Sequence, residues 1–163
     1  MKPSLLPKTI HASHIQLAQT MMLEHANLQG NVHGGWIMKL VDEAGGLAAT
    51  RHAGRRVVTV AIDRMIFRQP IRIGELVILE ADVTHTGRTS MEVEVQVVAE
   101  NPITGVKSNT NTAYLVYVAI DEKGRPAPVP PLVAETPEEM TRMKAAEIRQ
   151  KRRLEERKET EGI

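Results

Sequence analysis

The chain has 163 residues, enough for one domain with one hydrophobic core, and its 21 lysines and arginines nearly balance 20 acidic residues. The net charge of +1 and an aromatic content of 2% argue against nucleic acid or a membrane surface as the main partner, because such partners need basic patches or stacking side chains. Cysteine is absent, which excludes disulfides, a thiolate nucleophile and cysteine-ligated metals.

The N-terminal residues 1–11 are expected to form a loose leader. They contain no apolar run of the kind found in secretory signals, and Pro3 and Pro7 interrupt them. No stretch of the chain approaches the roughly 20 apolar residues that span a bilayer. We therefore expect a cytoplasmic protein.

The first regular elements are predicted to be a strand and a buried helix. Apolar and polar residues roughly alternate from Ile15 to Met22, which predicts a strand. A loop with the turn formers Asn27 and Gly30 follows. Residues 33–54 then place apolar side chains almost all round a helical projection, and such a helix is typically buried.

After Gly54 the pattern changes to that of strands. Four strands are predicted, at residues 57–67, 76–86, 90–100 and 109–121. One face of the resulting sheet is apolar, and the buried helix is its natural cover. The fold class is therefore α+β.

A charged tail, residues 134–163, closes the chain. Residues 124–131 hold four prolines and form a connector. Thr136 as N-cap, with Pro137 and Glu139 behind it, predicts the start of a helix. Because charges cover nearly every face of this helix, we expect it to be solvated and to fray. An arm for nucleic acid or membrane is the less favoured alternative, since acidic residues interleave the basic ones.

Two carboxylates interrupt the apolar pattern of the central helix. Burying a carboxylate is costly unless it is paired, hydrogen-bonded or protonated. Glu43 either faces solvent near Lys39 or has a function, and for Asp42 we favour a function. The Asp42 face ends in Gly45-Gly46. Glycine costs roughly 1 kcal/mol in a helix interior, so the pair indicates that substrate, a second subunit or a strand approaches the backbone there.

The start of this helix is a candidate binding site. Asn31 and His33 precede Gly34 and Gly35, and the first N–H groups of a helix have no helical partner. Such donors attract anions and polarised carbonyls, and in acyl transfer they would stabilise an oxyanion. The alternative is that Asn31 belongs to the N-cap region and the glycines only permit a tight entry.

The remaining candidates carry less weight. His33 is a possible general base, although a histidine at a helix start without a visible partner is more often structural. The other histidines lack the spacing of metal ligands, so no metal site is predicted. Ser90 lacks the context of a nucleophile elbow. Arg88, in the same turn, either reaches a phosphate or is a solvated turn residue.

Three segments taken together closely resemble the hotdog-fold acyl-CoA thioesterases. They are GNVHGGWIMKLVDEAG, RRVVTVAIDRMIFRQPIRIGELV and THTGRTSMEVEVQV. The nearest group is the bacterial single-domain type related to mammalian brain acyl-CoA hydrolase. The most specific feature is Asn31, His33, Gly34 and Gly35 followed by Asp42. The resemblance covers residues 12–133, which we take as the domain.

The resemblance implies a hotdog fold, with an antiparallel sheet wrapped around one long central helix from about Gly34 to Ala53. Two chains would pair edge strands, and three such dimers would form a homohexamer. Each active site would lie between two chains, with Asn31 from one and Asp42 from the other.

The resemblance also implies hydrolysis of acyl-CoA to fatty acid and CoA. The thioester carbonyl would accept hydrogen bonds from Gly35 N–H and Asn31. Asp42 would activate water as a general base or attack directly to give a mixed anhydride. CoA is part of the substrate, and no cofactor is expected. The expected contacts to CoA are Arg88, Thr89 and Ser90.

Two alternatives remain open. A hotdog dehydratase acting on 3-hydroxyacyl thioesters would pair His33 with Asp42 or Glu43, and it would hydrate crotonyl-CoA without releasing CoA. A non-catalytic acyl-CoA sensor would be stabilised by CoA without turnover, although the expected leader is too short for a helix-turn-helix. The sequence leaves the acyl chain length undecided.

Overall fold

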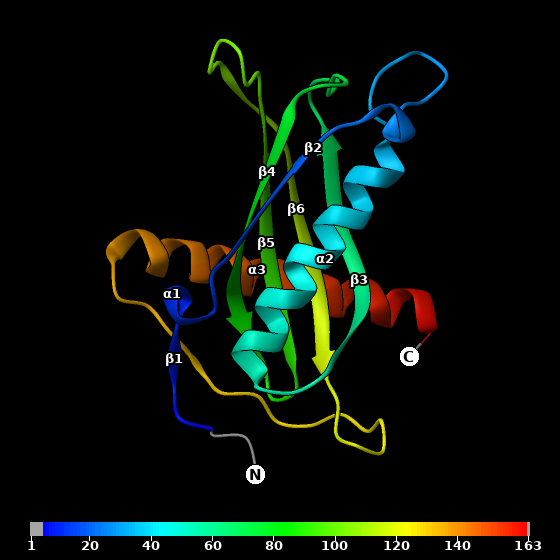
Figure 1. Cartoon of the computed structure of the whole chain (residues 1–163). Helices are drawn as coiled ribbons and strands as arrows, with labels where there is room; N and C mark the ends of the chain where they lie inside the picture. The colour runs from blue at the N-terminus through cyan, green and yellow to red at the C-terminus, as the bar shows by residue number, and fades with distance from the viewer. Residues whose placement is uncertain (1–4, 163) are drawn as a thin grey trace.

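A five-stranded antiparallel sheet lies against the long helix α2, Gly34–Ala53 (Figure 1). The computed structural model describes residues 5–162. The strand order is β2–β4–β5–β6–β3, with the following bounds: β2 Ile15–Thr20, β3 Val57–Phe67, β4 Leu76–Thr86, β5 Ser90–Glu100 and β6 Lys107–Ala119. The predicted α+β hotdog architecture is confirmed.

The core forms between α2 and one face of the sheet. In the central strand β5, Met91, Val93, Val95 and Val97 are fully buried, as are several residues of α2, among them Val41. Side chains two residues apart in a strand share a face, so these four project to the same side.

The observed bounds match the predictions except at two strands. β2 ends at Thr20 rather than Met22, because Met21 bonds through its backbone to Gly74 and Glu75. β6 runs over Lys107–Ala119 rather than 109–121, because Lys107 already pairs with Glu100.

The expected leader is attached to the domain from Lys8 onward. Strand β1, Lys8–Thr9, pairs in parallel with β7, Leu132–Val133, and a short helix α1, Ile10–Ser13, follows. Lys8 Nζ donates to the backbone oxygens of Arg51 and His52 at the end of α2. Residues 1–4 of the leader lie outside the described residues. A 3-10 turn, η1 Leu23–His25, precedes α2.

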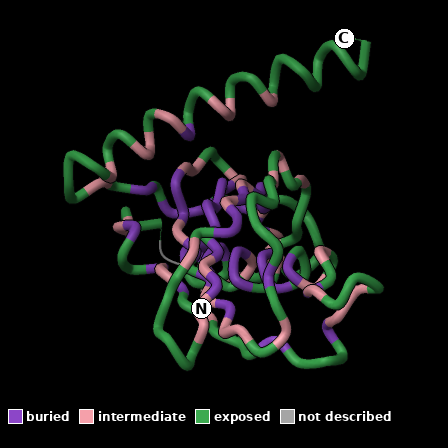
Figure 2. Tube along the Cα trace, turned by 90° about the horizontal axis from the view of Figure 1, so that it is seen from above, coloured by how far each residue is buried: buried purple, intermediate pink, exposed green. Residues whose placement is uncertain are grey.

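The C-terminal helix α3, Pro137–Glu161, begins as predicted. Thr136 Oγ1 accepts a hydrogen bond of 3.2 Å from the Glu139 N–H. Most residues of the helix are exposed, as expected for a solvated helix, but the expected fraying is wrong, because the helix is continuous to Glu161. It lies across the face of the sheet opposite α2 (Figures 1 and 2).

Three arginines of α3 bind four carboxylates of the sheet. Arg142 contacts Asp82 and Glu94, Arg149 contacts Glu92, and Arg153 contacts Glu92 and Asp63, all at 2.7–3.0 Å. The arginines at positions 142, 149 and 153 lie on one side of a helix. Glu92 and Glu94 alternate with the buried valines of β5 and so project to the opposite face, where they meet these arginines.

Among residues 5–162, no helix combines the length and apolar character needed to cross a membrane.

Candidate active site

Asp42 is held by hydroxyl groups from two strands. Thr59 Oγ1, on β3, donates to Asp42 Oδ1 at 2.8 Å. The Tyr117 hydroxyl, on β6, lies 3.0 Å from the same oxygen and 3.1 Å from the Asp42 backbone oxygen. Both side-chain contacts end on Oδ1, which leaves Oδ2 as the oxygen available to a reacting group. Asp42 itself is half-buried.

The second carboxylate, Glu43, faces solvent. Its Oε1 lies 2.6 Å from Lys39 Nζ, one turn earlier in α2, and both side chains are exposed. The solvated alternative is therefore the one observed for Glu43. Asp42 is the helix carboxylate that points toward the sheet.

His33 caps the start of α2. Its Nδ1 accepts a 2.9 Å hydrogen bond from the Gly35 N–H, so this donor, predicted to polarise a carbonyl, is engaged by the chain's own histidine. The His33 N–H donates to the His25 oxygen at 2.7 Å, which fixes the cap. The catalytic roles of His33 and Gly35 stay predictions.

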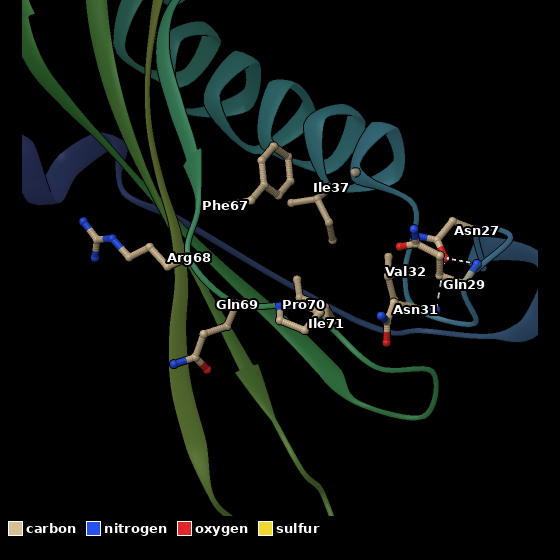
Figure 3. Close-up of a pocket in the computed structure, with 11 residues that line it drawn as sticks. Asn27, Gln29, Asn31, Val32, Ile37, Phe67, Arg68, Gln69, Pro70 and Ile71 are labelled. Atoms are coloured by element: carbon tan, nitrogen blue, oxygen red, sulfur yellow. Dashed lines mark hydrogen bonds between the residues drawn. The ribbon is translucent and has the colours of Figure 1, made fainter.

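A cleft of about 240 Å³ lies beside this helix start, lined by Asn27, Asn31, Phe67 and Ile37 among others (Figure 3). Asn27 Oδ1 accepts hydrogen bonds from the backbone N–H groups of Gln29, at 2.9 Å, and Asn31, at 3.2 Å. With its oxygen held by the loop, the amide nitrogen of Asn27 is left as a donor toward a ligand.

Asp42 and the cleft are separate within one chain. Asp42 lies eight residues beyond Gly34, which is about 12 Å along the axis of an α-helix. It does not line the cleft that contains Asn31. Asp42 and the asparagines of the cleft therefore do not line one pocket within the chain.

The turn with the predicted CoA contacts lies at the other end of the sheet. The Arg88 oxygen accepts from the Val129 N–H, and the Thr89 oxygen from the Ala119 N–H. Strand β5 begins at Ser90, and the next residue, Met91, pairs with Tyr117. The turn is therefore near Asp42 rather than near the chain's own cleft.

Across residues 5–162, no group of three or more His, Asp or Glu side chains is placed to hold a metal ion.

The sequence interpretation missed Thr59 and Tyr117 and treated Asn27 only as a turn former. Thr59 is a polar residue between valines in a predicted strand, which is a weak signal. Tyr117 carries a polar group on an inward-facing position. Burial and the neighbouring Asp42 carboxylate raise the pKa of Tyr117, so it remains a hydrogen-bond donor.

Comparison with known proteins identifies the family. Residues 29–106 match the thioesterase superfamily domain. A Zymomonas mobilis protein described as an uncharacterized acyl-CoA thioester hydrolase is 40% identical over 113 residues, which cover 68% of this chain and 74% of that protein. This chain belongs to the thioesterase superfamily. The mouse cytosolic acyl coenzyme A thioester hydrolase is 39% identical over 127 residues, 73% of this chain. The aligned part is 33% of the mouse protein, so the chain spans about a third of that relative.

Solved structures of thioesterases match nearly the whole chain. An apo-hexameric acyl-CoA thioesterase superposes with a TM-score of 0.89 and 35% identity, over 93% of this chain and 97% of that one. A Staphylococcus aureus acyl-CoA hydrolase, solved with butyryl-CoA, CoA and CoA disulfide, superposes with a TM-score of 0.89 and 30% identity, over 95% of this chain and 94% of that one.

Three further structures of the S. aureus enzyme each carry one alanine substitution, which replaces an aspartate in the first, an asparagine in the second and a threonine in the third. In that protein the asparagine lies 15 residues before the aspartate, and the threonine lies 17 residues after it. In this chain Asn27 and Thr59 have the same spacings from Asp42.

Proposed function

We propose that this protein hydrolyses acyl-CoA thioesters to a carboxylic acid and CoA, with Asp42 as the reacting carboxylate. The observation that carries the proposal is the Asp42 carboxylate, held at Oδ1 by Thr59 and Tyr117. A carboxylate fixed in this way serves as a general base for water or as a nucleophile. The CoA thiolate is a good leaving group, so no strong acid is required.

The active site is shared between two copies of the chain. Strand β3 ends the sheet, and its Val58, Val60, Ile62, Ile66 and Phe67 are each 40% or more exposed. An edge strand of this kind is a template for pairing with another chain.

The position of β3 also explains how such pairing completes the site. In the proposed dimer, two β3 strands pair in antiparallel fashion about their central residue, Ile62. This pairing sets Phe67 of one copy opposite Val57 of the other. Phe67 lines the cleft, and Thr59, close to Val57, holds Asp42. The cleft of one copy thereby faces Asp42 of the other. The hexameric state named for a similar thioesterase supports further assembly of dimers into a trimer of dimers.

The cleft supplies the amide that polarises the thioester carbonyl. The sequence predicts Asn31 for this role, whereas two observations favour Asn27. Its amide oxygen is held by the Gln29 and Asn31 N–H groups, which orients the nitrogen as a donor. Its spacing from Asp42 also equals that of the asparagine replaced in the S. aureus enzyme.

Two further parts of the proposal concern the contacts to CoA and the location of the protein. Arg88, Thr89 and Ser90 contact CoA, for which the support is their turn at the Asp42 end of the sheet. The protein is located in the cytoplasm. This is supported by three mammalian relatives, which are named cytosolic acyl coenzyme A thioester hydrolases.

A thiol-release assay across acyl-CoAs from acetyl to palmitoyl tests the proposed hydrolysis. We expect thiol release with at least one chain length, and the series also gives the chain-length preference. Hydration of crotonyl-CoA without thiol release would instead establish the dehydratase. Thermal stabilisation by CoA without any turnover would establish the sensor.

A further inference from the structure

Tyr117 is 1% exposed, yet its hydroxyl reaches the reacting carboxylate. The side chain projects from β6 toward α2 and contacts both Oδ1 and the backbone oxygen of Asp42. Thr59 reaches the same Oδ1 from β3. Two strands therefore hold one carboxylate oxygen from two directions.

Gly45 is what lets Tyr117 come so close to the helix. A Cβ atom at Gly45 would overlap the Tyr117 hydroxyl and lie 3.2 Å from both Cζ and Cε2 of the ring. At Gly46 a Cβ atom would meet only Cε1, at an ordinary 3.7 Å. Of the three causes that the sequence leaves open for the glycine pair, the structure thus shows a strand side chain at Gly45.

We infer that Tyr117 is a positioning residue for the reaction of Asp42, with Gly45 providing the space that it needs. This inference rests on the proposed thioester hydrolysis. The carboxylate torsion of aspartate is intrinsically broad, so a free side chain would point Oδ2 in many directions. Donors on Oδ1 from a buried ring and a strand restrict that rotation and aim Oδ2 at the substrate.

The Tyr117 hydroxyl lies 3.0 Å from Oδ1 and so fixes how the carboxylate is turned. Removing this donor should therefore lower kcat and leave KM nearly unchanged. If Tyr117 only filled the core, Tyr117→Phe, which keeps the ring, would leave kcat unchanged.

Tyr117→Phe keeps the ring and removes the donor. We expect kcat to fall roughly 10-fold or more, the scale of one hydrogen bond to a charged group, with KM changed less than about two-fold. Tyr114→Phe is the matched control, since Tyr114 lies on the same strand beneath Arg149 of α3, and it should change neither of these.

A glycine pair tests the same contact from the helix. Gly45→Ala should lower kcat as Tyr117→Phe does, whereas Gly46→Ala should retain kcat within about two-fold, although both remove one helical glycine. In the Tyr117→Phe background, Gly45→Ala should cost little further kcat, because the hydroxyl that it displaces is already absent. Circular dichroism and gel filtration establish that each variant is folded.

An unchanged kcat in folded Tyr117→Phe would overturn the inference, as would an equal loss of kcat in Tyr114→Phe. If the parent releases no thiol from any acyl-CoA, the proposed hydrolysis fails. The contact is then judged by the NMR chemical shift of the Asp42 carboxyl carbon, which should change in Tyr117→Phe and not in Tyr114→Phe. An unchanged chemical shift in Tyr117→Phe would reject the positioning role independently of activity.

Discussion

At position 42, the chain places one carboxylate against two hydroxyl groups that lie far away in sequence. Thr59 is 17 residues from Asp42 and Tyr117 is 75 residues away. Asp42 itself could be predicted, because a carboxylate is conspicuous in an apolar helix. Its partners could not, because a pattern along one element does not show which side chains of other elements meet it.

The asparagine of the cleft is open to a direct test with a matched pair. Asn27→Asp keeps the oxygen that the loop holds and removes the amide donor, so we expect kcat to fall about 100-fold, the scale of a lost oxyanion donor. Asn31→Asp introduces the same charge in the same cleft and should lose much less, as measured by thiol release. A larger loss in Asn31→Asp would instead support the asparagine that the sequence predicts.

The elements of the sheet and the central helix follow closely from the sequence, and the placement of α3 does not. Alternation in β5 predicts its apolar face correctly. The carboxylates on its other face, Glu92 and Glu94, look like solvated charges when the strand is read alone. They become ion-pair partners only when Arg142, Arg149 and Arg153 are seen to share one side of α3.

The attachment of α3 predicts unequal effects of two arginine substitutions. Arg149 is 18% exposed and pairs with the fully buried Glu92, whereas Arg152 pairs with Glu156 and is 53% exposed. Arg149→Met should lower the free energy of unfolding by roughly 2–3 kcal/mol. This is less than the loss expected when a buried charge is left without any partner, because Arg153 still binds Glu92. Arg152→Met should change it by less than about 0.5 kcal/mol. Urea unfolding at one protein concentration measures both, and equal effects would contradict the ion-paired docking.

The same network sets a direction for the effect of pH on stability. Burial alone would raise the pKa of Glu92, but hydrogen bonds from Arg149, Thr84 and Arg153 outweigh it and lower the pKa. A carboxyl whose pKa is lower in the folded state stabilises the fold above its unfolded pKa. That contribution is lost as the pH falls through the folded pKa. The stability gap between the parent and Arg149→Met should therefore narrow in acid.

At the scale of the whole molecule, the fold and family follow from the sequence, whereas the proposed site requires a second copy. Asn31 and Asp42 belong to one motif, yet about 12 Å of helix lies between Gly34 and Asp42. The edge position of β3 and its exposed apolar side chains point to where that copy pairs.

A shared site predicts complementation between two inactive variants. In a dimer of Asn27→Asp with Asp42→Asn, one site receives both intact residues and the other receives neither. Random mixing makes half of the dimers mixed, so co-refolded variants should recover about a quarter of parental thiol release. Recovery no greater than the sum of the separate variants would place each site within one chain.

The central claim is that Asp42 carries out the thioester hydrolysis. Asp42→Asn keeps the side-chain shape and one oxygen able to accept from Thr59 and Tyr117, and it removes the base or nucleophile. Thiol release from the preferred acyl-CoA, compared between the parent and folded Asp42→Asn, tests the claim most directly. We predict a loss of kcat of at least about 100-fold, in the range of a lost acid–base group. Hydrolysis by Asp42→Asn within a few-fold of the parent would contradict it.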